Sequence, residues 1–222
     1  MAYRVLALDI DGTLTNSKKQ ITERTKRAVS AAAAKGLKIV IASGRPVQGI
    51  RAFAKELELE KKDGYILSFN GGRLISCRTG EIIHDMKLPL EYLPEIYELS
   101  KKYKVNLMSY EGDDLITEEP DDEFLAIEAR INGLGIKKVD NLVEYINFPI
   151  NKCLMLGNGD YLAEVEKKGQ YFEDKLTKID GVKSVRRMGL MIGIELEKGD
   201  AHDIAIKCVE NGLLIITAKD LL

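Results

Sequence analysis

Two aspartates one residue apart, Asp9 and Asp11, are the first residues of this 222-residue chain whose types could do chemistry. They follow an unbroken apolar run, Val5–Leu8, which predicts a parallel strand buried on both faces. Two carboxylates at the end of such a strand repel one another, and the pKa of one of them rises unless a cation lies nearby. A hard divalent cation such as Mg²⁺ removes this cost, since it binds through one or two carboxylates together with phosphate oxygens. The same spacing also fits a plain turn, because Asp and Gly are common in turns.

The residues after the two aspartates extend the pattern. Gly12 lets the chain turn sharply away from the strand, and Thr13 offers a hydroxyl and a backbone N–H to an anion. Ligands bind at the C-terminal edge of the sheet in open α/β folds. The run Asp-Ile-Asp-Gly-Thr-Leu-Thr, which ends at Thr15, resembles the first motif of the haloacid dehalogenase (HAD) superfamily. This resemblance implies that Asp9 is a nucleophile that forms an aspartyl-phosphate, that Asp11 is the general acid and base, and that Thr13 holds a phosphoryl oxygen.

A second predicted strand, Leu37–Ala42, also ends in polar residues. A helix capped by Thr22 precedes it, so the three elements form a right-handed βαβ unit. Ser43, Gly44 and Arg45 follow the strand, and the next residue, a proline, suits the first turn of a helix. A hydroxyl at a helix N-terminus serves either as an ordinary cap or as part of a phosphate site. The run resembles the second HAD motif, which implies that Ser43 binds phosphate together with Gly44 and that Arg45 adds positive charge.

A third predicted strand, Tyr65–Phe69, leads to Asn70 and then to two glycines. Adjacent glycines allow either a hairpin turn or a close approach of the backbone to a ligand. The short strands predicted at Arg73–Ser76 and Glu81–His84 favour the hairpin. In the Cof-type branch of the HAD superfamily a similar Phe-Asn-Gly segment closes the substrate pocket, which implies a binding role for Asn70.

From Lys87 the order of predicted elements changes to helix, strand, strand, helix, strand, which indicates a second domain. It resembles the inserted α/β cap of Cof-type phosphatases, which covers the site and selects the substrate. The sequence therefore predicts an α/β protein with a Rossmann-like HAD core, built on a parallel sheet, plus an inserted α/β cap domain. The predicted boundaries are residues 1–85 for the first part of the core and 86–196 for the cap. Residues 197–222 form a C-terminal segment that could return to the core.

The chain departs from the HAD pattern after about Asp160. The family needs a third-motif lysine and a strand ending in Gly-Asp-x-x-Asn-Asp to complete the Mg²⁺ site, and the sequence has neither. Instead, the segment of about residues 165–220 resembles the start of the small C-terminal domain of acetylornithine aminotransferases, most specifically from Val185 to Leu196. The lysine that holds pyridoxal phosphate in that family has no counterpart here, so this segment alone cannot carry aminotransferase chemistry. The chain looks like a chimera of two unrelated pieces.

The C-terminal segment is predicted as helix, strand, strand, helix, strand, an order that would finish the cap and return to the core. His202, Lys198 and Asp220 fall near the positions of the missing groups, and we interpret all three as exposed surface residues. The last predicted strand is Leu213–Thr217. Because lysine and metal hold the charge of a phosphoryl transition state, loss of one such element costs about two to three decades in rate. We expect weak activity or none.

Composition narrows the class of protein. The formal net charge is −2, so the composition does not indicate a basic surface for binding nucleic acid. Hydrophobic residues make up 45% of the chain, as in a globular protein. No apolar run approaches the roughly 20 residues that a membrane span needs. Cys77, Cys153 and Cys208 have no metal or redox spacing, which suits a reducing cytoplasm. We expect a cytoplasmic protein that binds neither nucleic acid nor membrane, and whose open sheet edge could recruit a second copy of the chain.

Three hypotheses follow. The resemblance to HAD phosphatases implies Mg²⁺-dependent hydrolysis of a small phosphorylated metabolite, with Asp9 and Asp11 also binding the metal. The second hypothesis is a catalytically inactive chimera that retains the phosphate-binding loop without turnover. The third, an aminotransferase-related protein, is weaker, and a lack of pyridoxal absorbance would dismiss it.

Overall fold

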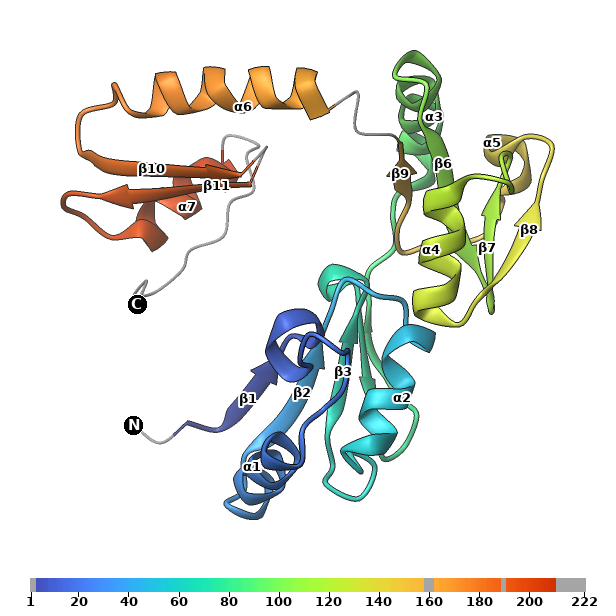
Figure 1. Ribbon diagram of the computed structural model, residues 1–222, viewed down its shortest axis with the longest axis vertical. Coiled ribbons are helices and arrows are strands. Elements are labelled where there is room, and N and C mark those ends of the chain that lie inside the picture. Colours follow the sequence, from blue (N-terminus) through green and yellow to red (C-terminus); the bar gives the residue numbers. More distant parts are fainter. Residues whose placement is uncertain (1–2, 158–161, 189–190, 211–222) are drawn as a thin grey trace. The chain divides into compact units, whose positions relative to one another are not determined.

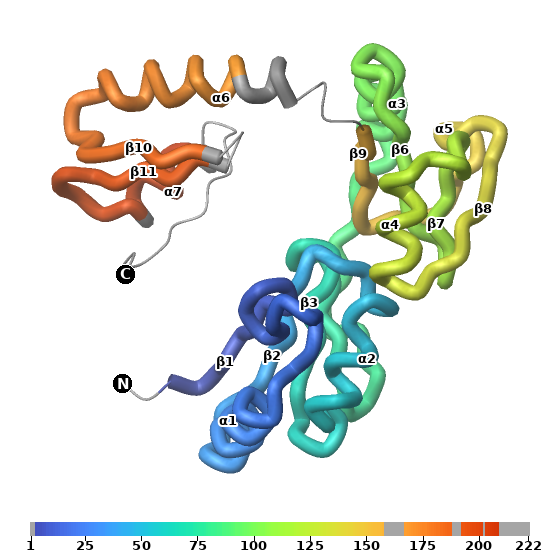
Figure 2. Tube along the Cα trace, viewed as in Figure 1, coloured from blue at the N-terminus to red at the C-terminus, as the bar shows by residue number. Residues whose placement is uncertain are grey.

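The computed structural model describes residues 3–157, 162–188 and 191–210. The chain divides into two compact units, Met1–Gly157 and Asn158–Leu222. In the described residues, the first unit contains a five-stranded and a four-stranded sheet, and the second contains a two-stranded sheet. Figure 1 labels the elements, and Figure 2 follows the backbone from one to the next. This mixed α/β architecture confirms the predicted fold class.

The five-stranded sheet has the order β1-β2-β3-β4-β5, in which the first three strands are parallel and the last two antiparallel. Its strands are β1 (Val5–Leu8), β2 (Lys38–Ala42), β3 (Tyr65–Ser68), β4 (Arg73–Ser76) and β5 (Ile82–Asp85). The crossovers contain α1 (Glu23–Ala34) and α2 (Gln48–Glu56). As predicted, the Thr22 side chain caps α1 by accepting a hydrogen bond from the backbone N–H of Thr25 at 3.2 Å.

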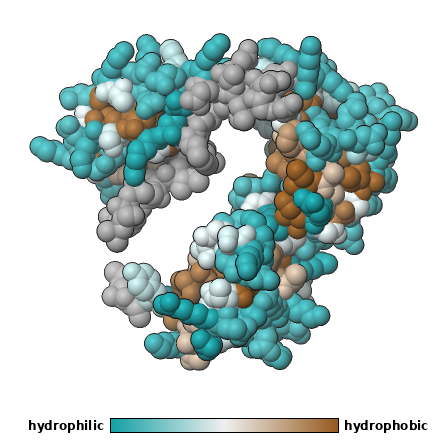
Figure 3. Space-filling model, in the orientation of Figure 1, coloured by the Kyte–Doolittle hydropathy of each residue, from teal (hydrophilic) through white to brown (hydrophobic). Residues whose placement is uncertain are grey.

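One face of this sheet is packed, and the prediction that the first strand is buried on both faces is wrong. Leu6 and Leu8 pack against a core that contains fully buried Ile39 and Ile41 together with residues of α1 and α2. The alternate residues of β1 are exposed, and Val5 is 55% exposed. The physical reason is that right-handed crossovers from β1 to β2 and from β2 to β3 place α1 and α2 on the same face of the sheet, and the core lies under these helices. β1 is also the terminal strand, and it pairs with β2 alone in the described part of the chain. Figure 3 shows hydrophobic surface over this strand.

The four-stranded sheet, of order β8-β7-β6-β9, is covered on both faces. Leu107 and Ile116 point into one hydrophobic core, and their strand neighbours Met108 and Leu115 point into another. The elements of this part are a 3₁₀ turn (Leu90–Tyr92), α3 (Leu93–Lys102), β6 (Asn106–Glu111), β7 (Asp114–Thr117), α4 (Glu123–Asn132), β8 (Gly135–Lys138), α5 (Leu142–Tyr145) and β9 (Leu154–Leu156). The predicted order of helix, strand, strand, helix, strand was therefore incomplete, because it lacked β8 and α5.

The second unit is a β-hairpin with two helices. It contains α6 (Leu162–Leu176), β10 (Val182–Met188), β11 (Met191–Leu196) and α7 (Ala201–Glu210). The hairpin strands are antiparallel and pair with each other in a sheet of their own. The predicted last strand and Asp220 lie outside the described residues, and the predicted domain boundaries stay a prediction. No helix in the described part of the chain has the length and apolar character needed to cross a membrane.

Candidate active site

The carboxyl ends of β1, β2 and β3 lie at one edge of the five-stranded sheet, as expected for parallel neighbours. The loops after β2 and β3 are joined by backbone hydrogen bonds. Ser43 donates to the carbonyl of Leu67 at 2.9 Å, and Phe69 donates to the carbonyl of Arg45 at 3.0 Å. Asn70 donates to the carbonyl of Ser43 at 3.3 Å. These bonds fix the loop that carries Ser43 beside the strand that leads to Asp9.

The turn after β1 explains why both aspartates face outward from the core. Ile10 and Leu14 are buried, at 0% and 2% exposure, and anchor the tight helical turn that follows the strand. The hydroxyl of Thr15 donates to the carbonyl of Ile10 at 2.8 Å and closes the turn. Gly12 has a φ of +83°, which a residue with a side chain rarely adopts. The apolar residues thus point inward, and Asp9 and Asp11 are left to line a cavity.

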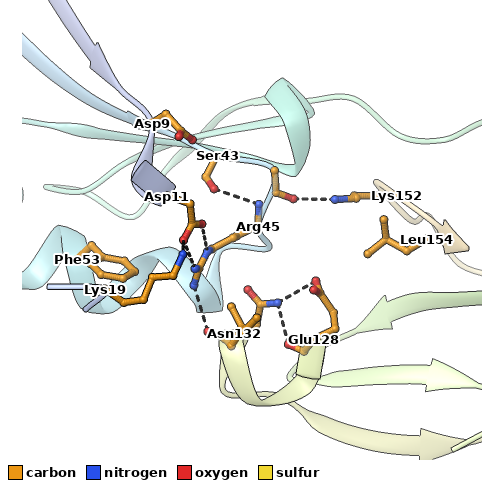
Figure 4. A pocket seen from close by; sticks show the side chains of 12 residues that line it. Asp9, Asp11, Lys19, Ser43, Arg45, Phe53, Glu128, Asn132, Lys152 and Leu154 are labelled. Carbon is orange, nitrogen blue, oxygen red and sulfur yellow. Dashed lines mark hydrogen bonds and ion pairs between the residues drawn. The ribbon is translucent and has the colours of Figure 1, made fainter. Parts of the chain in front are cut away.

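That cavity has a volume of about 650 Å³. Figure 4 shows its walls, with the sheet-edge residues on one side and residues of α4 and β9 across from them. Its lining residues are Asp9, Asp11, Lys19, Ser43, Gly44, Arg45, Phe53, Glu128, Ile131, Asn132, Lys152 and Leu154. The cavity therefore collects residues from both sheets of the first unit.

Asp11 is held by two cations. Its carboxylate accepts hydrogen bonds from Nε and Nη2 of Arg45 at 3.0 and 2.9 Å, and from Nζ of Lys19 at 2.7 Å. Partial burial alone would raise the pKa of Asp11, but these two cations outweigh it and hold the pKa below the ordinary carboxyl value. Arg45 also donates from Nη1 to the carbonyl of Ile131 at 3.1 Å, so it links the first sheet to the end of α4. Asp11 is ionised in this arrangement.

Asp9 differs from Asp11. Its carboxylate opens into the same cavity, and in the described part of the chain it has no hydrogen-bond or ion-pair partner. Mg²⁺ prefers oxygen donors and needs one or two carboxylates, since it keeps several waters and takes phosphate oxygens. The two aspartates therefore fit Mg²⁺ in donor type and number. The described residues contain no group of three or more His, Cys, Asp or Glu side chains that could hold a metal.

The other predicted site residues divide into two sets. Ser43, Gly44 and Arg45 line the cavity. Thr13 and Asn70 do not belong to its lining; Thr13 is exposed, and the Asn70 amide packs on Gly44, where an added Cβ would lie 3.2 Å from it. The binding roles of all five residues stay predictions.

The placement of Ser43 at a helix N-terminus was wrong. Helix α2 begins at Gln48, with Val47 as its N-cap, so Ser43 belongs to the loop before the helix. The proline at position 46 likewise precedes the cap instead of lying in the first turn. The backbone of this loop makes hydrogen bonds with the segment at the end of β3 and just after it, and these bonds compete with an earlier helix start.

Sequence reasoning missed three charged residues of the cavity, namely Lys19, Glu128 and Lys152. Lys152 donates to the carbonyl of Gly44 at 2.8 Å, and burial lowers the pKa of its ammonium, partly opposed by the charge of Glu128. Glu128 accepts hydrogen bonds from the hydroxyl of Tyr110 at 3.2 Å and from the amide of Asn132 at 2.9 Å. Glu128 and Lys152 stand alone in the sequence, without a motif around them.

Polar contacts of Asp85 join the two chain segments that connect the sheets of the first unit. Asp85, at the end of β5, accepts from Arg73 at 3.0 Å and from the Asn151 amide at 2.7 Å. These residues join the two chain segments that run between the sheets. On the opposite side α4 approaches α2 so closely that a Cβ on Gly49 would lie 2.1 Å from Oδ1 of Asn132.

Comparison with known proteins decides the family. The sequence model for haloacid dehalogenase-like hydrolases matches residues 6–205. The chain belongs to this family. The match extends beyond Asp160 and thus covers much of the segment that departs from the HAD motifs.

Curated relatives and a solved structure agree with this assignment. "Putative phosphatase YxeH" of Bacillus subtilis is 30% identical over 166 residues, covering 73% of this chain and 61% of that protein. "Putative phosphatase M6_Spy0533" of Streptococcus pyogenes is 32% identical over 180 residues, covering 80% of this chain and 66% of that protein. The chain thus spans a little under two thirds of either relative. A haloacid dehalogenase-like hydrolase from Bacteroides thetaiotaomicron has a TM-score of 0.66 and 31% identity, with 96% of this chain and 78% of that one covered.

A shorter similarity points elsewhere. Acetylornithine aminotransferase of Caldanaerobacter subterraneus is 42% identical over 59 residues, which is 25% of this chain and 15% of that protein. Its length agrees with the C-terminal segment of about residues 165–220. This confirms the predicted partial resemblance to aminotransferases beside the main assignment.

Proposed function

We propose that this HAD-family protein hydrolyses the phosphate monoester of a small metabolite through an aspartyl-phosphate on Asp9. The observation that carries the proposal is the meeting of Asp9, Asp11 and Ser43 around one cavity, beside Arg45. A cavity of about 650 Å³ suits a small ligand. Transfer of a phosphoryl group needs a nucleophile, a proton donor and fixed positive charge, which Asp9, Asp11 and Arg45 would supply in that order. Ser43 adds a hydroxyl that can bind a phosphoryl oxygen.

The proposed reaction has two steps. In the first, a carboxylate oxygen of Asp9 attacks phosphorus, the P–O bond to the leaving group breaks, and Asp11 gives its proton to the departing oxygen. In the second, Asp11 takes a proton from water, the water oxygen attacks the aspartyl-phosphate, and inorganic phosphate leaves Asp9 free again. Ser43 and Arg45 would hold the phosphoryl oxygens throughout.

The resting arrangement has to change for this cycle to begin. Asp11 is ionised while Lys19 and Arg45 both bind it, and a general acid must carry a proton. An incoming phosphoryl dianion would compete for the cations on Asp11, and loss of the Lys19 contact would make it easier for this carboxylate to take up a proton. Asp9 and Asp11 would hold Mg²⁺, which supplies positive charge to phosphoryl oxygens when bound.

A second candidate is a protein that binds phosphate without turnover. The missing third-motif lysine favours it, since that lysine holds the charge of the phosphoryl transition state in the family. Phosphate binding would then survive in a protein that hydrolyses nothing.

The test is Mg²⁺-dependent hydrolysis of p-nitrophenyl phosphate by the full chain beside Asp9→Asn. We expect the wild type to turn over and the variant to lose at least about 100-fold in kcat. Melting curves for both proteins show whether the fold is kept. A folded wild type that binds inorganic phosphate without hydrolysis would establish the second candidate, and equal rates in the two proteins would refute the role of Asp9.

A further inference from the structure

We propose that Lys19 is a catalytic residue of this site, whose ammonium leaves Asp11 to bind the phosphoryl oxygens; this rests on the proposed phosphatase function. The ammonium lies 2.7 Å from Oδ1 of Asp11, and the side chain lines the cavity together with Asp9. Figure 4 shows Lys19 and Arg45 reaching the same carboxylate.

The turn that carries Lys19 is built to present it. The side-chain oxygen of Asn16 accepts hydrogen bonds from the backbone N–H groups of Lys18 and Gln20 at 2.9 and 3.1 Å. Within this turn Lys19 has a φ of +59°, a left-handed conformation that is unfavourable for a residue with a side chain. Such conformations persist where surrounding bonds enforce them, and they are concentrated at functional sites. The hydrogen-bonded turn keeps Lys19 in this conformation, with its ammonium beside Asp11.

The charges around the cavity single out the same residue. The described lining contains three acidic side chains and three basic ones, namely Lys19, Arg45 and Lys152. The Arg45 guanidinium is engaged at Nε, Nη1 and Nη2, and partly buried Lys152 is bound to the Gly44 carbonyl. Among the described residues the Lys19 ammonium has one partner, Asp11, and the Lys19 side chain is 64% exposed.

Because Lys19 has fewer contacts than Arg45, its side chain can move more easily. An exposed ion pair is worth little, so Lys19 can leave Asp11 at small cost, whereas a shift of Arg45 breaks contacts to two elements. A phosphoryl dianion at Asp9 carries more charge than the Asp11 carboxylate and would therefore draw the ammonium toward it. Lys19 is the cation of this cavity that can follow the substrate.

The experiment compares Lys19→Met with Lys18→Met and Lys19→Arg in the full chain. Lys18 precedes Lys19 in the same turn, and its side chain has no described partner, so Lys18→Met matches the loss of one positive charge. Titration calorimetry with inorganic phosphate in the presence of MgCl₂ measures binding without requiring turnover. We expect Lys19→Met to raise the phosphate Kd about tenfold or more, Lys18→Met to stay within about twofold, and Lys19→Arg to recover most of the loss. For p-nitrophenyl phosphate, kcat/KM should fall in the same order.

Each outcome decides the proposal. Equal phosphate Kd values for Lys19→Met and Lys18→Met would overturn it, and so would a wild type that binds no phosphate. A third outcome separates the two proposals. If the wild type binds phosphate without turnover and Lys19→Met loses that binding, the phosphatase function is refuted and Lys19 stays a phosphate ligand. The melting temperatures of all variants should agree, because the Lys19–Asp11 pair is exposed; a drop confined to Lys19→Met would indicate a structural role instead.

Discussion

The two compact units of this chain differ in how far they bury their apolar side chains. The first unit has a core of fully buried aliphatic side chains, among them Ile50, Leu115 and Leu125 at 0% exposure. In the second, Ala205 is the one buried hydrophobic side chain among those described, while Tyr171 and Phe172 are 60% and 50% exposed. Both units contain strands and helices, so secondary structure alone does not separate them.

This contrast bears on which part of the chain supports the candidate site. A site holds its geometry when packed elements support it, and all twelve lining residues of the cavity belong to the first unit. The described residues of the second unit contribute no side chain to the cavity. The partial similarity to an aminotransferase, in which such a segment is joined to a much larger protein, agrees with this difference.

The largest effect should come from matched isoleucines in the two units. Ile50 in α2 is fully buried, and Ile206 in α7 is 46% exposed. Ile50→Ala should lower the free energy of unfolding by about 2–5 kcal/mol, through lost burial and the cavity left behind. Ile206→Ala should change it by less than about 1 kcal/mol. Urea denaturation measures both, and equal losses would break the comparison.

A smaller effect, dependent on pH, is expected at Asp85. Burial would raise the pKa of this carboxyl, but hydrogen bonds from Arg73, Lys87 and Asn151 hold it well below the usual carboxyl range. A depressed folded pKa contributes stability above the unfolded pKa, near 4, and that stability is lost as pH falls toward the folded value. Asp85→Asn should therefore cost about 1–3 kcal/mol at pH 7, with the difference from wild type shrinking below about pH 4.

The control for Asp85 is an ion pair in the second unit. Glu195 accepts from Lys183 at 2.5 Å, but both side chains are largely exposed. Glu195→Gln should leave stability unchanged at every pH. A gap between wild type and Asp85→Asn that stays constant from pH 7 to pH 3 would contradict the assignment of the effect to ionised Asp85.

The smallest effect should come from two glycines. A Cβ on Gly49 would lie 2.1 Å from Oδ1 of Asn132, whose amide is held by Glu128 and is not free to move aside. Gly49→Ala should cost about 1 kcal/mol, since overpacking outweighs the helix propensity gained. Gly193→Ala in β11 meets nothing closer than 3.9 Å and should be neutral or slightly stabilising. The melting temperatures of the two variants measure this difference. If Gly49→Ala melts at the wild-type temperature, α4 can move away from α2.

Local signals predicted most of the fold. Apolar runs bounded by caps and turn residues located β1, β2 and β3, because each strand is a continuous hydrophobic stretch. β8 was missed since Gly135–Lys138 contains a single apolar residue, and its strand form depends on parallel pairing with β7, which no local pattern records. The half-exposed state of β1 was missed for a related reason, because the face of a strand that becomes buried is decided by helices elsewhere in the chain.

The residues of the candidate site likewise fall into those that the sequence could locate and those that it could not. Asp9, Asp11 and Ser43 could be located because strand ends carry local motifs. Glu128 and Lys152 reach the cavity through the folding of the second sheet, and nothing near them in sequence marks them. Lys19 had a usable signal, since an Asn three residues earlier in a polar loop favours a side-chain-stabilised turn.

The pairing of β1 on one side only affects how precisely Asp9 can be positioned. Asp9 continues a strand that is hydrogen-bonded to β2 and, in the described residues, to no other strand. A displacement of about 1 Å at a reacting group can cost on the order of 100-fold in rate. Asp9 as the proposed nucleophile is therefore aligned by a single neighbouring strand among the described residues, and a chain bound to the free side of β1 would change the rate of the proposed reaction without entering the cavity.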